Sequence, residues 1–336
     1  MELKLNAKVI KCVGGIFAIR LGNPELEQLR ASGVEPESDI LYCKARGVFR
    51  HERITLLAGN NVVVRIDPRL LIASESEQGS EFDASAGIMI DEILPRKNEL
   101  IRPPMANLDL IFCVFAAAKP EPALITVDKL VTIAEYKQIE PVIVITKADL
   151  APDAAERYAD IYRRCGFSVF VCGIGSDCGE LERFVREKSD LTSVFAGASG
   201  VGKSTLMNRL FPSLHLTTGE VSPKTLHGRH TTRHSELYPL DRYFDGATGY
   251  IADTPGFGML DFVKFDFYTK DDLVYVFREF EPYLGHCRYT KCTHTKEEGC
   301  AILDAVREGK IPRERHDSYL EFYAELKNKH NYGNTK

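Results

Sequence analysis

The strongest chemical signal in the sequence is the stretch Gly197-Ala-Ser-Gly-Val-Gly-Lys203-Ser204. It fits G-x-x-x-x-G-K-[ST], a pattern whose glycines turn the chain so that backbone N–H groups point at phosphates. Lys203 would neutralise the β- and γ-phosphates, and the Ser204 hydroxyl would face Mg²⁺. The strand-like run TSVFA precedes the stretch and the helix-like run KSTLMNRLF follows it, as a phosphate loop requires. The predicted phosphate-binding residues are Gly197, Ala198, Ser199, Gly200, Val201, Gly202, Lys203, Ser204 and Thr205.

A second phosphate-side element is Asp253-Thr-Pro-Gly256, which follows the short apolar run TGYIA and begins 50 residues beyond Lys203. At the end of a strand, the Asp253 carboxylate would hold Mg²⁺ through water. The N–H of Gly256 would sense the γ-phosphate. The tetrapeptide is a weak signal alone, but its distance from Lys203 makes it a strong one.

The loop between these elements, GRHTTRHSEL at 228–237, carries paired threonines. We expect Thr232 to present its hydroxyl to Mg²⁺, with Thr231 as the alternative. A basic loop without any such role is the simpler interpretation of the same residues.

A base-reading element, Thr146-Lys147-Ala148-Asp149, precedes the phosphate loop. The Asp149 carboxylate can accept hydrogen bonds from guanine N1–H and the N2 amino group, whereas adenine offers no matching donors. The stem of Lys147 can cover the purine, and Thr146 occupies a position where Asn is more common. Alone, these residues could equally start a helix. The predicted base-side residues are Thr146, Lys147, Ala148 and Asp149, joined by Cys172 and Gly173 at the end of the run FSVFVC.

A metal site is indicated by Cys287-x4-Cys292-x-His294-x5-Cys300. Three thiolates and one imidazole make a closed tetrahedral set that favours Zn²⁺, with no open position for catalysis. We therefore expect one structural zinc ion. Coincidental clustering of thiols is the alternative interpretation.

The elements that position these residues change character along the chain. Residues 1–72 contain β-rich runs separated by turn signals, which predict a small antiparallel barrel of the oligonucleotide-binding (OB) type. A generic β-barrel adaptor would give the same pattern. Residues 73–107 are polar and turn-rich, so we interpret them as a connector.

From residue 108 onward, near-continuous apolar runs alternate with stretches of helical spacing. This alternation predicts an α/β domain over 108–265, with a parallel sheet covered by helices on both faces. Ligands bind such sheets at the carboxyl ends of strands, where the candidate motifs lie. Residues 266–336 surround the metal set with apolar residues at helical spacing, so we expect a zinc-pinned helical domain.

Composition sets broader bounds. At 336 residues the chain is long enough for two or three domains, and its net charge of −5 argues against a uniformly basic nucleic-acid binder. The excess of Lys and Arg is confined to residues 1–72, with 11 against 8 Asp and Glu. No signal peptide or membrane-spanning run is evident, so we expect a cytoplasmic protein without a membrane partner, and a monomer. The cysteines outside the metal set are scattered, as in a reducing compartment.

Together, the motifs resemble those of the ribosome small subunit-dependent GTPase A family, whose members are circularly permuted GTPases. The order TKAD, GASGVGKS, GRHTTR, DTPG and the C-x4-C-x-H-x5-C set carry the resemblance, which covers nearly the whole chain. It implies GTP hydrolysis stimulated by the small ribosomal subunit, binding of its 16S rRNA, and a role in late subunit maturation. The chain departs from the family in Cys172-Gly173 and in AGNNVVV, where Gly-Asp is usual before the strand. The second departure could alter a contact between the barrel and RNA.

Catalysis is the least determined step. A water-orienting Gln often follows the Asp-x-x-Gly element, but Phe257 stands there and cannot polarise water. The resemblance makes His230 the replacement, with His227 and His234 on the same loop as the alternatives. Gly200 stands where potassium-activated relatives place Asn, so it supports no potassium requirement. The alternative function is an RNA-binding scaffold that holds guanine nucleotide with negligible turnover. A nucleotide kinase is more distant, because no second substrate-phosphate motif accompanies the loop.

Overall fold

The computed structural model describes residues 2–51, 54–71, 87–101, 103–175, 178–214, 235–253 and 267–333. The chain forms two compact units. One comprises the described parts of 1–108 and 227–255, and the other the described parts of 109–226 and 256–336. The division at 108 lies within one residue of the expected start of the α/β domain, and a segment from the second half of the chain also clusters with the N-terminal barrel.

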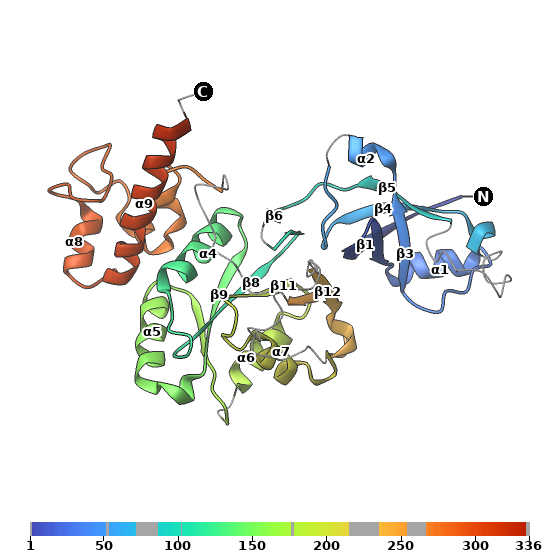
Figure 1. The fold of residues 1–336 in the computed structure, drawn as a ribbon, viewed down its shortest axis with the longest axis horizontal. Coiled ribbons are helices and arrows are strands. Elements are labelled where there is room, and N and C mark those ends of the chain that lie inside the picture. The colour runs from blue at the N-terminus through green and yellow to red at the C-terminus, as the bar shows by residue number, and fades with distance from the viewer. Residues whose placement is uncertain are drawn as a thin grey trace, which may run out of the picture. The chain divides into compact units, whose positions relative to one another are not determined.

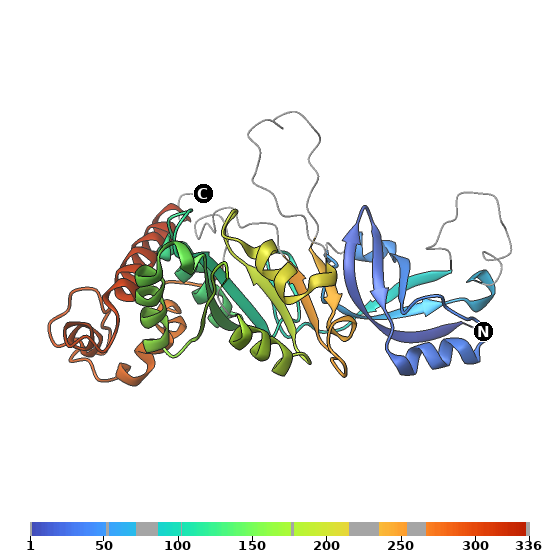
Figure 2. The ribbon, with the colours of Figure 1, turned by 90° about the horizontal axis from the view of Figure 1, so that it is seen from below.

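The first unit is built on a closed five-stranded barrel (Figures 1 and 2), which confirms the expected OB-type fold. Its strands pair in the circular order β1-β2-β3-β5-β4, with β4 returning to β1. Alternate residues of β4 are buried, as expected for a strand with one face in the core. The strands are β1 (Leu3–Val13), β2 (Ile16–Arg20), β3 (Ile40–Ala45), β4 (Asn61–Ile66) and β5 (Ile88–Ile93).

Three features of the barrel differ from the expectation. The fifth strand, β5, lies inside the expected connector 73–107, where six residues of alternating burial follow a long polar stretch. Helix α1 (Asn23–Ala31), with Pro24 in its first turn, packs Leu26 and Leu29 into the barrel core. A short helix, α2 (Gly47–His51), begins within the β-rich run DILYCKARGVFR at 39–50, which was expected to be strand throughout.

Asn60, part of the unusual AGNNVVV stretch, is fully buried. Its side-chain oxygen accepts hydrogen bonds from the Leu57 N–H at 2.8 Å and from Arg96 Nη2 at 3.0 Å. The side-chain oxygen of Asn60 therefore stabilises an internal turn. Because Asn60 has no exposed surface, the expected change in a contact between the barrel and RNA is not supported.

The first unit also contains a hairpin of β12 (Glu236–Pro239) and β13 (Tyr250–Asp253), joined through the 3₁₀ turn η3 (Leu240–Arg242). Its strands are antiparallel, with Glu236 opposite Asp253. The sequence placed this segment in the α/β domain, and in addition β12 pairs with barrel strand β1 through Lys11 and Glu236.

The second unit contains a parallel sheet in the order β10-β9-β8-β11 (Figure 1), as the apolar runs predicted. Phe112 and Phe115 of β8 lie on opposite faces: Phe112 contacts Phe184 of α6, while Phe115 contacts Tyr158 of α5. Helices thus cover both faces. The strands are β8 (Leu110–Ala116), β9 (Glu140–Thr146), β10 (Ser168–Val171) and β11 (Thr192–Ala196), and the helices are α4 (Leu124–Tyr136), α5 (Pro152–Arg164), α6 (Gly179–Glu187) and α7 (Lys203–Leu210).

The 3₁₀ helices η1 (Ala148–Leu150) and η2 (Pro212–Leu214) also belong to the second unit, and its described C-terminal part, 267–333, contains two more 3₁₀ helices and two α-helices. The expected helical run DDLVYVFREFEPYL forms η4 (Leu273–Val276) and η5 (Arg278–Tyr283), the latter containing Pro282. Helices α8 (Ala301–Arg307) and α9 (Arg313–Gly333) follow. The first unit also contains two short strands, β6 (Glu99–Leu100) and β7 (Met105–Ala106), which come just before β8 in the sequence. No described helix is both long and apolar enough to cross a bilayer.

A buried ion network attaches α9 to the sheet's helices. Arg315 has no exposed side-chain surface and contacts Asp128 of α4 at 2.5 Å and Glu279 of η5 at 2.7 Å. Asp128 also accepts hydrogen bonds from Tyr162 of α5 and Ser318 of α9, at 2.9 and 2.5 Å. Burial raises the pKa of Asp128, and the guanidinium opposes that shift. One guanidinium thus serves two buried carboxyl groups, so removing Arg315 would leave both without their cationic partner.

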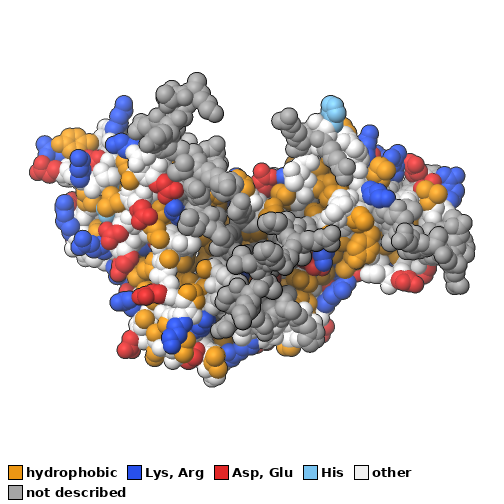
Figure 3. All heavy atoms as spheres, viewed as in Figure 1, with side chains coloured by type: hydrophobic (Ala, Val, Ile, Leu, Met, Phe, Trp, Pro, Cys, Tyr) orange, Lys and Arg blue, Asp and Glu red, His pale blue; other side chains and the backbone are white. Residues whose placement is uncertain are grey.

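The surface carries charges of both signs. On the face drawn in Figure 3, Lys and Arg side chains alternate with Asp and Glu, without a broad area of one sign. This mixture agrees with the near balance of 43 Lys and Arg against 48 Asp and Glu.

Arg315→Met keeps the apolar stem and removes the buried charge. We expect it to lower the free energy of unfolding of the second unit by about 3–5 kcal/mol, measured by urea denaturation with circular dichroism. Arg307→Met is the matched control: Arg307 is 68% exposed, and its pairing with Asp304 should contribute less than about 1 kcal/mol. Equal losses in both variants would contradict the importance of the network.

Candidate functional site

The expected phosphate loop, residues 197–202, connects β11 to α7. Gly197 packs against strand β8 so closely that a Cβ atom would lie 2.0 Å from the Val114 carbonyl oxygen. Gly200 and Gly202 adopt φ values of +78° and +96°, which side-chain-bearing residues rarely adopt. The three glycines are therefore required by backbone geometry, one by close approach and two by conformation.

Lys203 is the first residue of α7 and is buried. Its Nζ donates to the carbonyl oxygens of Gly197 and Ala198, at 2.9 and 3.1 Å, and so lies over its own loop. Ser204 and Thr205 follow in the first turn of the helix. A helix N-terminus preceded by a glycine-rich turn attracts anions, and the lysine adds a full positive charge there.

Thr146 joins the base-reading element to the phosphate loop. Its buried hydroxyl lies within hydrogen-bonding distance of the carbonyl oxygens of Phe115 and Val201, and the contact to Val201 is the shorter. The hydroxyl has one proton, so it donates to one carbonyl at a time. Lys147, at φ +53°, donates from Nζ to the Gly200 carbonyl at 2.8 Å. Both side chains therefore reach from the end of β9 to the loop after β11.

Asp149 lies beside the second base-side element. Its carboxylate accepts a hydrogen bond from the Ile174 N–H at 2.8 Å, and the Ala148 N–H donates to the Cys172 carbonyl at 3.1 Å. Gly173 offers its carbonyl to Arg209 Nη1 of α7 at 3.2 Å. The structure thus brings TKAD, Cys172-Gly173 and the phosphate loop to the carboxyl edge of one sheet. The contributions of Ile174 and Arg209 were missed, since a backbone donor and a helix arginine have no motif.

The remaining predicted residues divide into two groups. Asp253 ends β13 and belongs to the first unit. His230, Thr232 and Gly256, together with Thr231, lie outside the described residues. The expected Mg²⁺ set of Ser204, Thr232 and Asp253 therefore stays a prediction, as does catalysis by His230.

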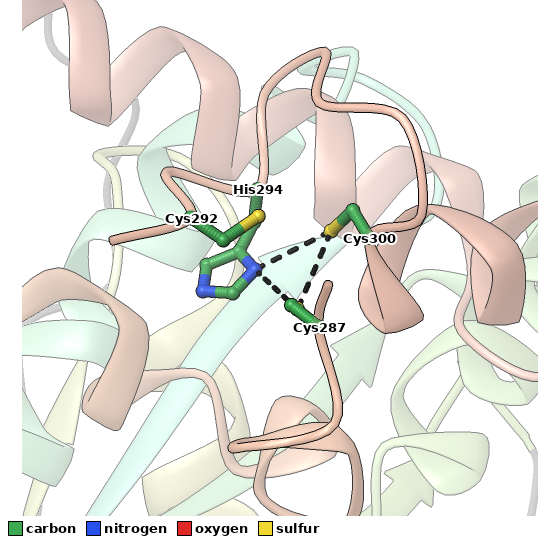
Figure 4. Close-up of side chains that lie close together, drawn as sticks. All are labelled: Cys287, Cys292, His294 and Cys300. Atoms are coloured by element: carbon green, nitrogen blue, oxygen red, sulfur yellow. Dashed lines mark hydrogen bonds between the residues drawn. The ribbon is translucent and has the colours of Figure 1, made fainter. Parts of the chain in front are cut away.

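The expected zinc ligands meet in the loop between η5 and α8 (Figure 4), with all four ligand atoms within 4.8 Å of one another. Nδ1 of His294 lies 3.5 Å from Sγ of Cys287 and 3.4 Å from Sγ of Cys300, and these two sulfurs are 3.9 Å apart. A zinc tetrahedron with bonds of about 2.0–2.3 Å has edges of roughly 3.3–3.8 Å. The donor set, including Cys292, therefore fits one Zn²⁺ ion.

Helix α9 and one carboxylate shape the zinc loop. His316 Nε2 donates to the His294 carbonyl at 2.9 Å, and the Tyr319 hydroxyl donates to the Thr293 carbonyl at 2.9 Å. Glu297 accepts from the Thr293 and Thr295 N–H groups, each at 3.0 Å. These supporting residues were not identified from the sequence, because their partners are backbone atoms.

Cys287→Ser or Cys300→Ser should release the metal and unfold the loop and its helices, because structural zinc supplies about 10–16 kcal/mol of apparent folding free energy. Metal analysis of protein purified without chelator should give one zinc per chain for wild type and none for either variant. Cys12→Ser, which changes a barrel thiol, should retain zinc. Wild-type protein without stoichiometric zinc would disprove the assignment.

Comparison with known proteins agrees with this geometry. A family model described as RsgA GTPase matches residues 93–263. The chain is 38% identical over 303 residues to the small ribosomal subunit biogenesis GTPase RsgA of Alkaliphilus metalliredigens, covering 89% of this chain and 95% of that protein. It is 34% identical over 327 residues to the same-named protein of Bacillus subtilis, covering 96% and 97%.

Solved structures extend the likeness to the fold. YloQ, described as a circularly permuted GTPase, is 31% identical with a TM-score of 0.68, covering 97% of this chain and 96% of that one. YjeQ from Thermotoga maritima is 26% identical with a TM-score of 0.69, covering 96% and 99%. The permuted order of motifs and the predicted fold class are confirmed, and the family indicates GTPase activity. Because the family model spans more than half of the chain and the relatives align over most of it, this chain belongs to the RsgA GTPase family.

Proposed function

We propose that this chain binds and hydrolyses GTP as an assembly factor of the small ribosomal subunit, with 16S rRNA as part of its binding surface. The observation that carries the proposal is the junction of the TKAD and phosphate loops, made by Thr146 on Val201 and Lys147 on Gly200. This junction supports one purine nucleotide spanning both loops. The names of the relatives, small ribosomal subunit biogenesis GTPases, support the choice of partner.

Each loop has a separate task in this proposal. Asp149 reads guanine N1–H and N2, with its loop braced by the Ile174 N–H. Lys203 neutralises the β- and γ-phosphates, and Gly256 senses the γ-phosphate through its N–H. The oxygen donors of Ser204, Thr232 and Asp253 suit Mg²⁺, which when bound with the nucleotide offsets phosphate charge.

Hydrolysis requires a group that orients the attacking water, and we assign that role to His230. Phe257 occupies the usual place of the water-orienting Gln and has no polar group. In our proposal, docking on the small subunit brings Thr232 and His230 to the nucleotide. The isolated protein then turns over GTP slowly, and the subunit stimulates it.

Asp149→Asn should weaken GTP binding on the order of a hundredfold or more, because two charge-assisted hydrogen bonds of about 1.5–3 kcal/mol each are lost. It should admit xanthosine triphosphate, whose C2 carbonyl accepts from the new amide. The Asn side-chain oxygen still accepts from Ile174, so the loop should persist. Calorimetric titration with GTP, ATP and xanthosine triphosphate measures this, with exposed Asp153→Asn as control. Equal affinity of the wild type for GTP and ATP would rule out guanine recognition.

His230→Ala should remove most of the subunit-stimulated turnover, since a well-placed catalytic group contributes about 10²–10⁴-fold. GTP affinity and subunit binding should change little, whereas Lys203→Ala should impair nucleotide binding itself. The measurement is phosphate release beside co-sedimentation with purified small subunits.

His227→Ala and His234→Ala are matched controls on the same loop. Full stimulation in His230→Ala would remove the histidine from the mechanism, and an equal loss of subunit binding would show that it docks. Absence of stimulation in the wild type would favour the nucleotide-holding scaffold instead.

A further inference from the structure

The strand that ends in Asp253 is fastened to the barrel. Strand β12 pairs with β1 through Lys11 and Glu236, whose side chains form an ion pair of 2.6 Å. Strand β13 pairs with β12 and ends directly at Asp253. Both strands cluster with the barrel in one compact unit. A displacement of the barrel is therefore also a displacement of the Asp253 backbone.

A single guanidinium makes the central side-chain connection. Arg20, the last residue of β2, is only 14% exposed, and its Nε contacts Asp39 of the barrel at 2.6 Å. Its Nη2 forms an ion pair with Asp241 of η3, and its guanidinium carbon lies 5.7 Å from the ring centre of Tyr250. Tyr250 opens β13, three residues before Asp253. Arg20 thus contacts the barrel and both ends of the segment that joins β12 to β13.

Neighbouring charges reinforce this connection. Arg242 of η3 contacts the second oxygen of Asp39 at 3.0 Å, so Asp39 receives one arginine from each side. Lys8 of β1 lies 5.4 Å from the ring centre of Tyr250. We name Arg20, Asp39, Asp241, Arg242 and Tyr250 the hairpin clamp. The planar fork of Arg20 fixes the two carboxylates in direction as well as distance, which a lysine in its place would not do.

We propose that Arg20 is a positioning residue through which a partner bound to the barrel acts on Asp253 and so regulates GTP hydrolysis. The inference rests on the proposed function, in which Asp253 serves the Mg²⁺ of the nucleotide, and it takes the barrel as the surface that meets rRNA, as an OB-type fold predicts. The loops that bind guanine and phosphate belong to the second unit, and the hairpin clamp contains none of their residues. Loss of the clamp should therefore affect the stimulated reaction while leaving nucleotide affinity unchanged.

The test compares Arg20→Gln, which removes the charge, with Arg20→Lys, which keeps the charge without the fork. Arg46→Gln is the matched control, since Arg46 is 49% exposed and pairs with Asp91 of barrel strand β5 at 3.1 Å. We expect Arg20→Gln to reduce subunit-stimulated kcat roughly tenfold or more, because small misplacements of reacting groups are costly. Its KM for GTP, its unstimulated rate and its co-sedimentation with small subunits should stay within about twofold of wild type. Arg20→Lys should lie between wild type and Arg20→Gln.

Hydrogen exchange supplies a readout independent of turnover. In Arg20→Gln, the amides of residues 236–253 should exchange faster, while those of 197–214 should not change. Wild-type stimulation in Arg20→Gln, or unchanged exchange in the hairpin, would overturn the role of Arg20 and leave the proposed function standing. Absence of stimulation in the wild type would instead overturn the proposed function and this inference together.

Discussion

The close approach of two parallel strands, β8 and β11, sets the geometry of the nucleotide edge. The Val114 carbonyl of β8 occupies the space where any side chain at position 197 would begin, so the phosphate loop must leave β11 through a glycine. Strand β9 is registered on β8 with Thr146 opposite Ala116, and its hydroxyl then reaches Val201. Register across the sheet, rather than order along the chain, places these loops together. The base-reading loop can therefore precede the phosphate loop without altering the site.

A second constraint ties the C-terminal helices to this sheet. Asp128 receives hydrogen bonds from α5 as well as α9, and Arg315 also engages η5. Buried charges with several fixed partners tolerate one docking arrangement, because each alternative leaves a charge unpaired. Helix α9 in turn holds the zinc loop through His316 and Tyr319. A continuous set of polar contacts thus extends from α4 to the metal ligands, and the zinc loop is part of the same compact unit as the phosphate loop.

Much of this organisation was predictable, and the exceptions have physical reasons. Some features leave a pattern in a short stretch of the sequence and can be predicted from it. Examples are the glycines that the phosphate loop requires, Gly197 and Gly202, and the apolar runs that fill whole strands. Strand β5 was missed because it follows a polar stretch. The pairing of β12 with barrel strand β1 was missed because nothing in the sequence near 236–239 indicates a partner 225 residues away. Arg315 pairs with a residue 187 positions away, and no spacing rule connects them. The unusual Asn60 was expected to affect a contact with RNA, but its side chain is buried and accepts hydrogen bonds within the first unit. His230, Thr232 and Gly256 remain predictions outside the described residues.

The long separations in sequence also affect how the chain is synthesised. Asp128 is made 187 residues before Arg315, and Lys11 is made 225 residues before Glu236. At translation rates of about 5–20 residues per second, each interval lasts about 10–40 seconds. Through that interval the nascent barrel lacks the hairpin that pairs with β1, and the nascent sheet carries a carboxylate whose arginine does not yet exist. The first unit cannot complete its packing until residue 253 has been made, and the second cannot until residue 315 has been made, so the emerging chain carries unpaired groups for most of its synthesis.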